Sequence, residues 1–367
     1  MNILLLPGAF KGSLSALRAG QILSRCLSPR HHVRCFPIAD GGDGFMDTFA
    51  ALDPKATLIK TRAKNAFLQT RNTSFLLLSD GKTAVLETAR ICGLGSAKKE
   101  ELDPLGASSY GVGQVLLEAV KHGATKIYVG LGGVACNDGG AGLSVACGAQ
   151  IFDKQGRPLP LGAQPLLQAA NLDLTTLYTN FKGIQIIGCA DVTNPLLGPK
   201  SSAKIFGPQK GATPEQVKIL DKAMARWAHI IRQAGRQDTS HTPSTAAAGA
   251  IAAGLYGCFR AKLLLGANFL LQKAALEMHV PWADLIITSE GKLDAQTFYG
   301  KAPLAVLRLA QKYKKPVLFI CGQADWKSLT DKKLARTTVA ELIDFAPSLE
   351  MAQKYAGKYI TQIGKLL

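Results

Sequence analysis

Short apolar runs alternate with amphipathic segments over the first sixty residues. We read residues 2–6, 33–38 and 57–60 as strands, and residues 14–27 and 45–52 as helices. Strands that alternate with helices are typical of a parallel sheet, because parallel neighbours need long crossover connections. The pattern therefore predicts an α/β fold at the start of the chain.

The same alternation returns near the end of the chain. The strands expected there are 284–288, 316–321 and 338–342, and the helices are 303–313 and 349–367. Both ends thus predict one parallel-sheet domain built from two separate segments.

The middle of the chain has a different pattern. Residues 72–78 and 82–87 flank an Asp-Gly turn, which predicts an antiparallel hairpin, and long helices are expected between residues 213 and 275. We therefore expect a second α/β domain, residues 66–282, inserted into a discontinuous first domain, residues 1–65 and 283–367. One middle helix is well defined, because Thr213 and Gln216 form a capping box, Pro214 suits the first turn, and an apolar stripe follows.

Composition and charge narrow the function. The 367 residues include 43 Lys and Arg against 26 Asp and Glu, giving a net charge of +17. The cations are spread along the chain without interleaved aromatic residues, so we expect a small anionic partner, with no nucleic acid and no membrane. The oligomeric state is left open.

The cysteines and the N-terminus bear on the compartment. None of the eight cysteines forms a CxxC pair, which argues against a disulfide framework or a thiolate metal site. The N-terminus lacks the basic region of a secretory signal, and no apolar run is long enough to span a bilayer. We therefore expect a cytoplasmic protein.

Four predicted strands run directly into glycine and acidic or amide residues. Ligands of open α/β sheets bind beyond the carboxyl ends of the strands, where glycines let backbone amides approach an anion. Any one of these acids could instead be a helix cap, but four together favour phosphoryl transfer, which needs oxygen ligands for Mg²⁺ and a carboxylate that aligns a hydroxyl. The junctions contain Asp40, Gly41, Gly42 and Asp43; Asn137 and Asp138; Asp191; and Glu290, Gly291 and Asp294.

Several lysines lie beside these junctions. Lys11 precedes a helix that we expect Ser13 to cap, and a cation at that end of a helix is unfavourable without a nearby anion. Other basic glycine-bearing turns contain Lys204 and Lys210, and Gln296, Gly300 and Lys301. The alternative for Lys11 is a solvated lysine whose stem covers apolar surface, and the segment with Lys204 and Lys210 could simply be exposed.

The order of these motifs resembles the class I glycerate kinase family over nearly the whole chain. The matching stretches are Phe10-Lys11-Gly12-Ser13, Ala39-Asp40-Gly41-Gly42-Asp43-Gly44, Asn137-Asp138-Gly139-Gly140, Asp191-Val192-Thr193-Asn194-Pro195, Phe206-Gly207-Pro208-Gln209-Lys210-Gly211 and Glu290-Gly291 with Asp294, Gln296, Gly300 and Lys301.

The resemblance implies phosphorylation of D-glycerate by ATP and Mg²⁺, in a cleft between a Rossmann-like domain and an inserted α/β domain. The product would be 2-phosphoglycerate or 3-phosphoglycerate. Lys11, Asp191 and Asp294 are the catalytic candidates, and Asp191 or Asp294 would hold the metal. The candidates for substrate and phosphate binding are Ser13, Asp40, Gly41, Gly42, Asp43, Asn137, Asp138, Asn194, Lys204, Lys210, Glu290, Gly291, Gln296, Gly300 and Lys301.

The chain departs from the family pattern at several positions. Gly8 and Ala9 stand where the family has Asp and Ser, and Ser289 stands where it has Gly. Val134 and Cys136 replace small hydroxylated residues, and residues 243–249 contain fewer glycines than the family has. Two alternatives therefore stay open: a weakened paralogue that binds a hydroxy acid or nucleotide, and a kinase for a related acid such as tartronate.

Overall fold

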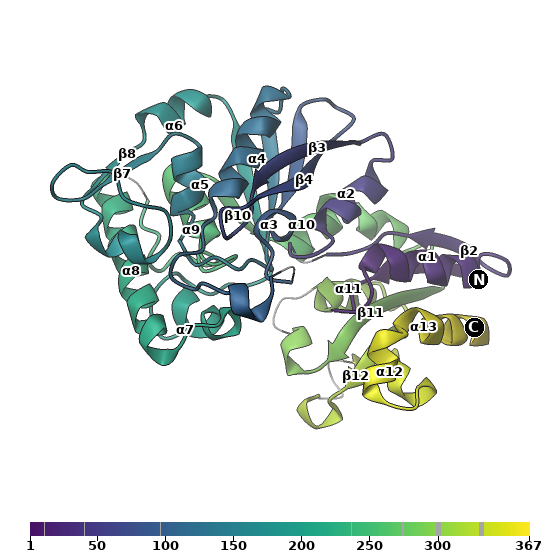
Figure 1. Ribbon diagram of the computed structural model, residues 1–367. Coiled ribbons are helices and arrows are strands. Elements are labelled where there is room, and N and C mark those ends of the chain that lie inside the picture. Colours follow the sequence, from purple (N-terminus) through teal and green to yellow (C-terminus); the bar gives the residue numbers. More distant parts are fainter. Residues whose placement is uncertain are drawn as a thin grey trace. The chain divides into compact units, whose positions relative to one another are not determined.

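The chain forms two compact units in the computed structural model (Figure 1). One unit contains Met1–Pro54 and Gly266–Leu367, and the other contains Lys55–Leu265. The division falls after residues 54 and 265 instead of 65 and 282, because the strand after residue 54 pairs within the second unit and the helix after residue 265 packs in the first. The structure describes residues 1–10, 12–39, 41–95, 97–235, 237–273, 275–298, 302–329 and 334–367.

The first unit is built on a five-stranded sheet whose described pairings are all parallel. Its strand order is β13-β12-β11-β1-β2. The parallel sheet expected from the two ends of the sequence is therefore confirmed. The strands are β1 (Asn2–Pro7), β2 (His32–Cys35), β11 (Leu285–Leu293), β12 (Val317–Ala324) and β13 (Thr337–Glu341).

Helices cover both faces of this sheet, as an apolar parallel strand requires. In β1, Ile3 and Leu5 belong to the core shared with α1 and α13, whereas Leu4 and Leu6 pack with α11 on the other face. Figure 1 shows α1 and α13 side by side, with both chain ends in this unit. The helices are α1 (Ala16–Leu27), α2 (Phe45–Leu52), α10 (Gly266–Lys273), α11 (Ala302–Lys312), α12 (Leu349–Lys354) and α13 (Ala356–Leu366).

The second unit has a six-stranded mixed sheet of order β10-β9-β6-β5-β4-β3. Four strands are parallel, and β4 and β3 extend the sheet in antiparallel fashion. The strands are β3 (Thr57–Lys64), β4 (Thr70–Leu77), β5 (Thr83–Glu87), β6 (Lys126–Leu131), β9 (Gln185–Ala190) and β10 (Lys262–Leu265), with β7 (Gln150–Phe152) and β8 (Asn171–Asp173) as a separate hairpin.

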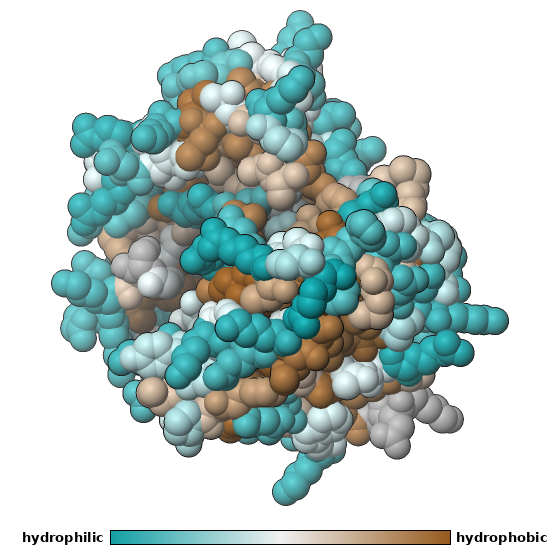
Figure 2. All heavy atoms as spheres, turned by 90° about the vertical axis from the view of Figure 1, so that its right-hand side faces the viewer, coloured by the Kyte–Doolittle hydropathy of each residue, from teal (hydrophilic) through white to brown (hydrophobic). Residues whose placement is uncertain are grey.

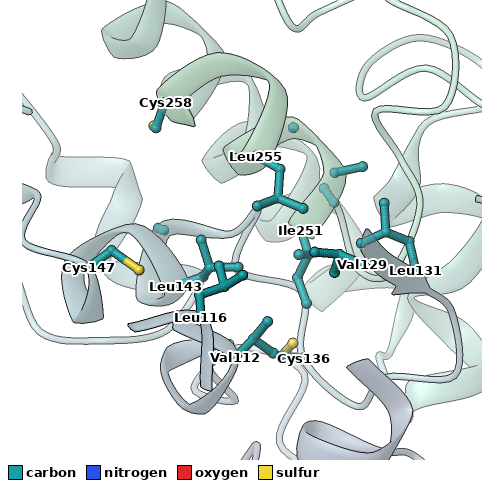
Figure 3. Close-up of a cluster of buried hydrophobic side chains, with 14 of the residues drawn as sticks. Val112, Leu116, Val129, Leu131, Cys136, Leu143, Cys147, Ile251, Leu255 and Cys258 are labelled. Atoms are coloured by element: carbon teal, nitrogen blue, oxygen red, sulfur yellow. The ribbon is translucent and has the colours of Figure 1, made fainter. Parts of the chain in front are cut away.

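The helices of the second unit enclose one hydrophobic core. Figure 3 shows part of it, where side chains from α4, α5, α9 and β6 meet. The capping box on Thr213 and the buried stripe of α8 are both confirmed. The helices are α3 (Thr88–Cys92), α4 (Tyr110–Lys121), α5 (Ala141–Ala146), α6 (Thr175–Asn180), α7 (Ser202–Phe206), α8 (Pro214–Gln233) and α9 (Ile251–Phe259).

The structure corrects four local expectations. The strand expected at 57–60 belongs to the second sheet, because a turn built on the Asn65 side chain pairs it with β4. The region from 213 to 275 contains the strand β10, and the last helix is divided at Tyr355. Ser15, not Ser13, caps α1, because its side chain accepts a hydrogen bond from the Arg18 amide.

On the face drawn in Figure 2, hydrophilic residues cover most of the surface, and hydrophobic patches lie between them. Within the described ranges, no helix combines the length and the apolar character that crossing a membrane requires.

Candidate functional site

The first unit brings two strand ends together at a change of direction in its sheet. Strand β2 lies on one side of β1, and β11 lies on the other side, followed by β12 and β13. The strand order therefore proceeds in opposite directions from β1 and from β11, which makes the β1–β11 junction a topological switch point. Pairing ends at Pro7 and Ser289, and β11 then continues to Leu293 beside β12. Such junctions are where open α/β sheets bind ligands.

The two sequence departures at this junction are in direct contact. The Gly8 amide donates to the Ser289 carbonyl at 3.1 Å, and the Ser289 hydroxyl donates to the Gly8 carbonyl at 2.9 Å. A Cβ atom at Gly8 would lie 2.4 Å from the Ser289 carbonyl oxygen. Gly8 is thus required by the close approach of the β11 backbone.

We expect Gly8→Ala to lower the free energy of unfolding by about 1–3 kcal/mol, because the added methyl group forces the two backbones apart. Urea unfolding measures the change. Gly95→Ala is the control, since a Cβ there meets open space and Gly95 has no left-handed φ. Equal losses in the two variants would contradict the close packing described for Gly8.

Beyond this junction, Thr297 organises the acidic turn after β11. Its buried hydroxyl donates to Glu290 Oε2 at 2.8 Å and accepts from the Asp294 amide at 3.2 Å. Lys292 Nζ lies 3.6 Å from Asp294 Oδ2. One threonine therefore contacts the Glu290 carboxylate on β11 and the Asp294 backbone in the turn that follows, with Gly291 between these two candidates on β11.

The other candidates of the first unit have varied surroundings. The Ser13 hydroxyl donates to the Gln353 carbonyl. Gly41 and Gly42 are buried, and Asp43 is exposed before α2. Four candidates lie outside the described residues, as does the side chain of Gln296: these four are Lys11, Asp40, Gly300 and Lys301.

In the second unit, the carboxyl ends of β5, β6 and β9 lie next to one another. Asp191 directly follows Ala190, which is paired with Leu131 at the end of β6. The Thr88 hydroxyl, after β5, donates to the Gly130 carbonyl at 2.8 Å and accepts from the Gly132 amide at 3.3 Å. Asp191 is half-buried beside this glycine loop.

Asp138 holds the loop after β6 in place. The carboxylate is fully buried, and its Oδ2 accepts from the Ser109 amide at 2.7 Å and hydroxyl at 2.9 Å, the Ser108 hydroxyl at 3.1 Å and the Gly142 amide at 3.1 Å. Oδ1 accepts from the Gly140 amide at 3.2 Å. These donors lie at the N-termini of α4 and α5, where a negative charge is favourable. The protein itself thus satisfies this carboxylate.

Asn137 and Lys210 are also buried. Asn137 donates to the Pro104 carbonyl at 3.3 Å, and its Oδ1 has no hydrogen-bond partner among the described residues. Lys210 Nζ donates to the Cys136 carbonyl at 2.7 Å, and burial lowers the pKa of Lys210 below its usual value. Lys210 therefore fixes the loop through its backbone.

Because the pKa of Lys210 is lowered by folding, the folded protein binds fewer protons than the unfolded chain as the pH approaches 10.5. The contribution of Lys210 to stability must then rise with pH. We expect the free energy of unfolding of the wild type, relative to Lys210→Met, to increase from about pH 8 to about pH 10. The raised pKa of the Cys189 thiol, which burial alone causes, affects both proteins and cancels.

Urea unfolding at several pH values measures this difference. Lys204→Met is the control for loss of one ammonium group from the same segment. The lowered pKa would be contradicted if the difference in free energy of unfolding between the wild type and Lys210→Met did not change with pH. It would also be contradicted if the differences for Lys210→Met and Lys204→Met changed with pH in the same way.

The segment 243–250 packs against the same loop in a strained conformation. Ser244, Ala248 and Ala250 have φ values of 68°, 53° and 63°, a region that favours glycine. Gly249 is also left-handed, and a Cβ there would lie 1.9 Å from the Cys136 carbonyl oxygen. The backbone therefore keeps the shape suited to glycine although three of these positions carry side chains.

This segment also connects to the loop after β9. The Ala246 amide donates to the Asn194 carbonyl at 3.1 Å, and Thr245 Oγ1 accepts from the Leu196 amide at 2.9 Å. Asn194 itself donates to the Lys200 carbonyl at 3.0 Å. The loops that follow β6 and β9 are thus joined through residues 243–250.

Lys204 and Glu87 need separate comment, because Lys204 was a candidate from the sequence and Glu87 was not. Lys204 is exposed and pairs with Asp221 at 3.1 Å, which turns its ammonium group toward α8. Glu87 ends β5, is 4% exposed and lies 3.6 Å from Arg90. Sequence reasoning missed Glu87, although its strand also runs from apolar residues into a carboxylate.

The donor set suits a hard cation held partly by a substrate. Within the described part of the chain, no three His, Cys, Asp or Glu side chains gather into a metal cluster. Mg²⁺ is usually held by one or two carboxylates together with phosphate oxygens and water. Asp191 in the second unit has the required oxygen chemistry, and so, separately, do Glu290 and Asp294 in the first unit.

The fold defines a discontinuous α/β protein, and comparisons with known proteins give its family. The glycerate kinase family model matches residues 3–367. Glycerate kinase of Halalkalibacterium halodurans is 36% identical over 88% of this chain and 85% of its own length, and glycerate 2-kinase of Escherichia coli is 36% identical over 90% and 86%. The crystal structure assigned as glycerate kinase 2 of Salmonella typhimurium matches with a TM-score of 0.83 and 32% identity, over 100% of this chain and 96% of that one.

The chain belongs to the glycerate kinase family. The resemblance seen in the sequence motifs is thus confirmed, and the protein is a kinase, an enzyme that transfers a phosphoryl group.

Proposed function

We propose that this enzyme transfers the γ-phosphoryl group of ATP to D-glycerate in the presence of Mg²⁺, and that the product is 2-phosphoglycerate. Membership of the family carries the proposal, and the relative named glycerate 2-kinase supports the position of transfer. Acidic and glycine-rich loops at the carboxyl ends of parallel strands in both sheets supply the residue types that the reaction needs.

Asp191 is proposed to accept the proton of the attacking hydroxyl. It follows β9 directly, so a buried strand fixes its backbone, and its half-buried carboxylate lies beside a glycine loop. A carboxylate that orients the hydroxyl lowers the barrier mainly by positioning and by accepting the proton as the new bond forms. Asp294 is the alternative for this role.

The turn after β11 is proposed to bind the phosphate groups. Thr297 holds Glu290 and Asp294, and the Lys292 ammonium lies next to Asp294. Glu290 and Asp294 would hold Mg²⁺ there, with Asp191 as the alternative ligand. When bound, the cation neutralises phosphate charge. Lys11 and Lys301, outside the described residues, are proposed to neutralise further phosphate charge.

Asn137, Asp138 and Lys210 are proposed to act mainly by shaping the loop after β6. Asp138 is satisfied by five protein donors, and Lys210 binds the Cys136 carbonyl. They would keep the Gly133 backbone amide in position for an anionic group of the substrate.

Coupled measurement of ADP formation tests the proposal. With ATP and Mg²⁺, we expect turnover on D-glycerate to exceed turnover on tartronate and on water alone. Preference for tartronate would favour a kinase for a related acid. A thermal shift with D-glycerate but no ADP would instead favour a weakened paralogue.

A further inference from the structure

The second unit has a cavity at the opposite end of its sheet from Asp191. Its volume is about 570 Å³, within the usual range for small-molecule sites. The lining comes from the end of α6, the start of β9, the end of α9 and the start of β10. Since β9 begins at this cavity and ends before Asp191, the cavity is separate from the candidate active site.

Part of the cavity lining is apolar and buried. Leu177 and Ile186 are 0% and 4% exposed. Phe181 and Phe259 meet edge to face, with ring centroids 5.0 Å apart and an angle of 87° between the rings. Aromatic and aliphatic walls of this kind favour a planar apolar group.

All charged residues of the lining are cations. Lys182, Arg260 and Lys262 are exposed, and the lining contains no Asp or Glu. Within the described residues, no carboxylate lies in salt-bridge range of these three side chains, whereas Lys204 and Lys312 have such partners. Three cations in a partly apolar lining favour a ligand that carries a negative charge.

Arg260 is held in a conformation that is costly for arginine. Its φ and ψ are 58° and 31° at the end of α9, where glycine is the usual residue. Its guanidinium lies 6.0 Å from the centre of the Tyr178 ring, within the range of a cation–π contact. The strained position thus places an arginine at an aromatic wall of the cavity.

We propose that this cavity binds a small organic anion that has a planar ring, with the ring on the Phe181 and Tyr178 side and the anionic group on Arg260, Lys182 and Lys262. The cavity is larger than a three-carbon acid fills, which favours a ligand with a ring. The site lies entirely within the second unit and does not depend on the proposed reaction.

Adenosine monophosphate is the probe, because it combines a planar ring with a phosphate group. Titration of protein labelled at the isoleucine methyl groups is followed by NMR, with the Ile186 signal assigned through Ile186→Val. We expect AMP to shift the signals of Ile184 and Ile186, both of which line the cavity. Adenosine and inorganic phosphate are each expected to bind there at least about tenfold more weakly, because each lacks one half of the recognised chemistry.

Arg260→Gly separates binding from stability. It removes the cation and also the left-handed strain, so we expect about tenfold weaker AMP binding at the Ile186 signal, together with a Tm raised by about 2 °C. Lys314→Gly is the matched control: Lys314 is an exposed cation with a φ of 55° at the end of α11, outside the cavity. It should raise Tm without changing AMP binding.

Two results would overturn the proposal. One is the absence of Ile184 and Ile186 shifts at millimolar AMP, which includes the case where AMP binds only at the nucleotide site of the kinase. The other is unchanged AMP affinity in Arg260→Gly while the higher Tm shows that the variant is folded.

Discussion

Asp191→Asn is expected to lower the turnover number on D-glycerate by about 10²–10⁴-fold, because the amide retains the shape of the carboxylate but cannot accept the hydroxyl proton. The side chain follows β9 and is half-buried, so the exchange leaves the strand and its pairing with β6 intact. Tm should therefore stay close to that of the wild type. Steady-state ADP formation and a thermal melt measure the two quantities.

Asp173→Asn is the control for this variant. Asp173 is an exposed carboxylate on β8 that accepts hydrogen bonds only from Thr175 among the described residues. We expect turnover of the control to match the wild type. Near-normal turnover in Asp191→Asn would remove Asp191 from the reaction and transfer the proposed role to Asp294.

Asp138→Asn is expected to produce the opposite pattern, a large loss of stability. Four donors converge on Oδ2, and an amide nitrogen at that position would face donors instead of accepting from them. Breaking a buried charged network of this kind costs about 3–5 kcal/mol. Urea unfolding should show this loss, with Asp173→Asn changing stability by less than about 1 kcal/mol.

A stable Asp138→Asn protein would contradict the structural role of this carboxylate. Stable folding combined with lost turnover would instead place Asp138 among the residues that contact substrate. Together, the Asp191 and Asp138 variants distinguish a carboxylate that acts in the reaction from one that holds the loop.

Local patterns predicted much of the fold. The parallel strands at both ends were visible because each combines a short apolar run with a flanking helix, and the capping box on Thr213 marked the start of α8 to the residue. Strand β3 was assigned to the wrong sheet because its partner depends on a turn at Asn65, which the alternation of strands and helices does not reveal.

The sequence indicated which types of residue the candidate site contains, but it did not indicate what each residue contacts. Asp138 and Asp191 have the same sequence signature, an acid after a buried strand, yet three of the five donors to Asp138 come from Ser108 and Ser109, about 30 positions earlier in the chain. Lys204 and Lys210 lie on one basic segment, but one pairs with Asp221 and the other is buried against Cys136. Such differences depend on tertiary contacts between distant segments, which local spacing does not encode.

The most direct test of the account is identification of the product formed from ATP, Mg²⁺ and D-glycerate by phosphorus and proton NMR. We predict ADP and a phosphate ester whose phosphorus couples to the single proton on carbon 2. Coupling to the two protons on carbon 3 would contradict transfer to the 2-hydroxyl, and the absence of any phosphate ester would contradict glycerate as the substrate.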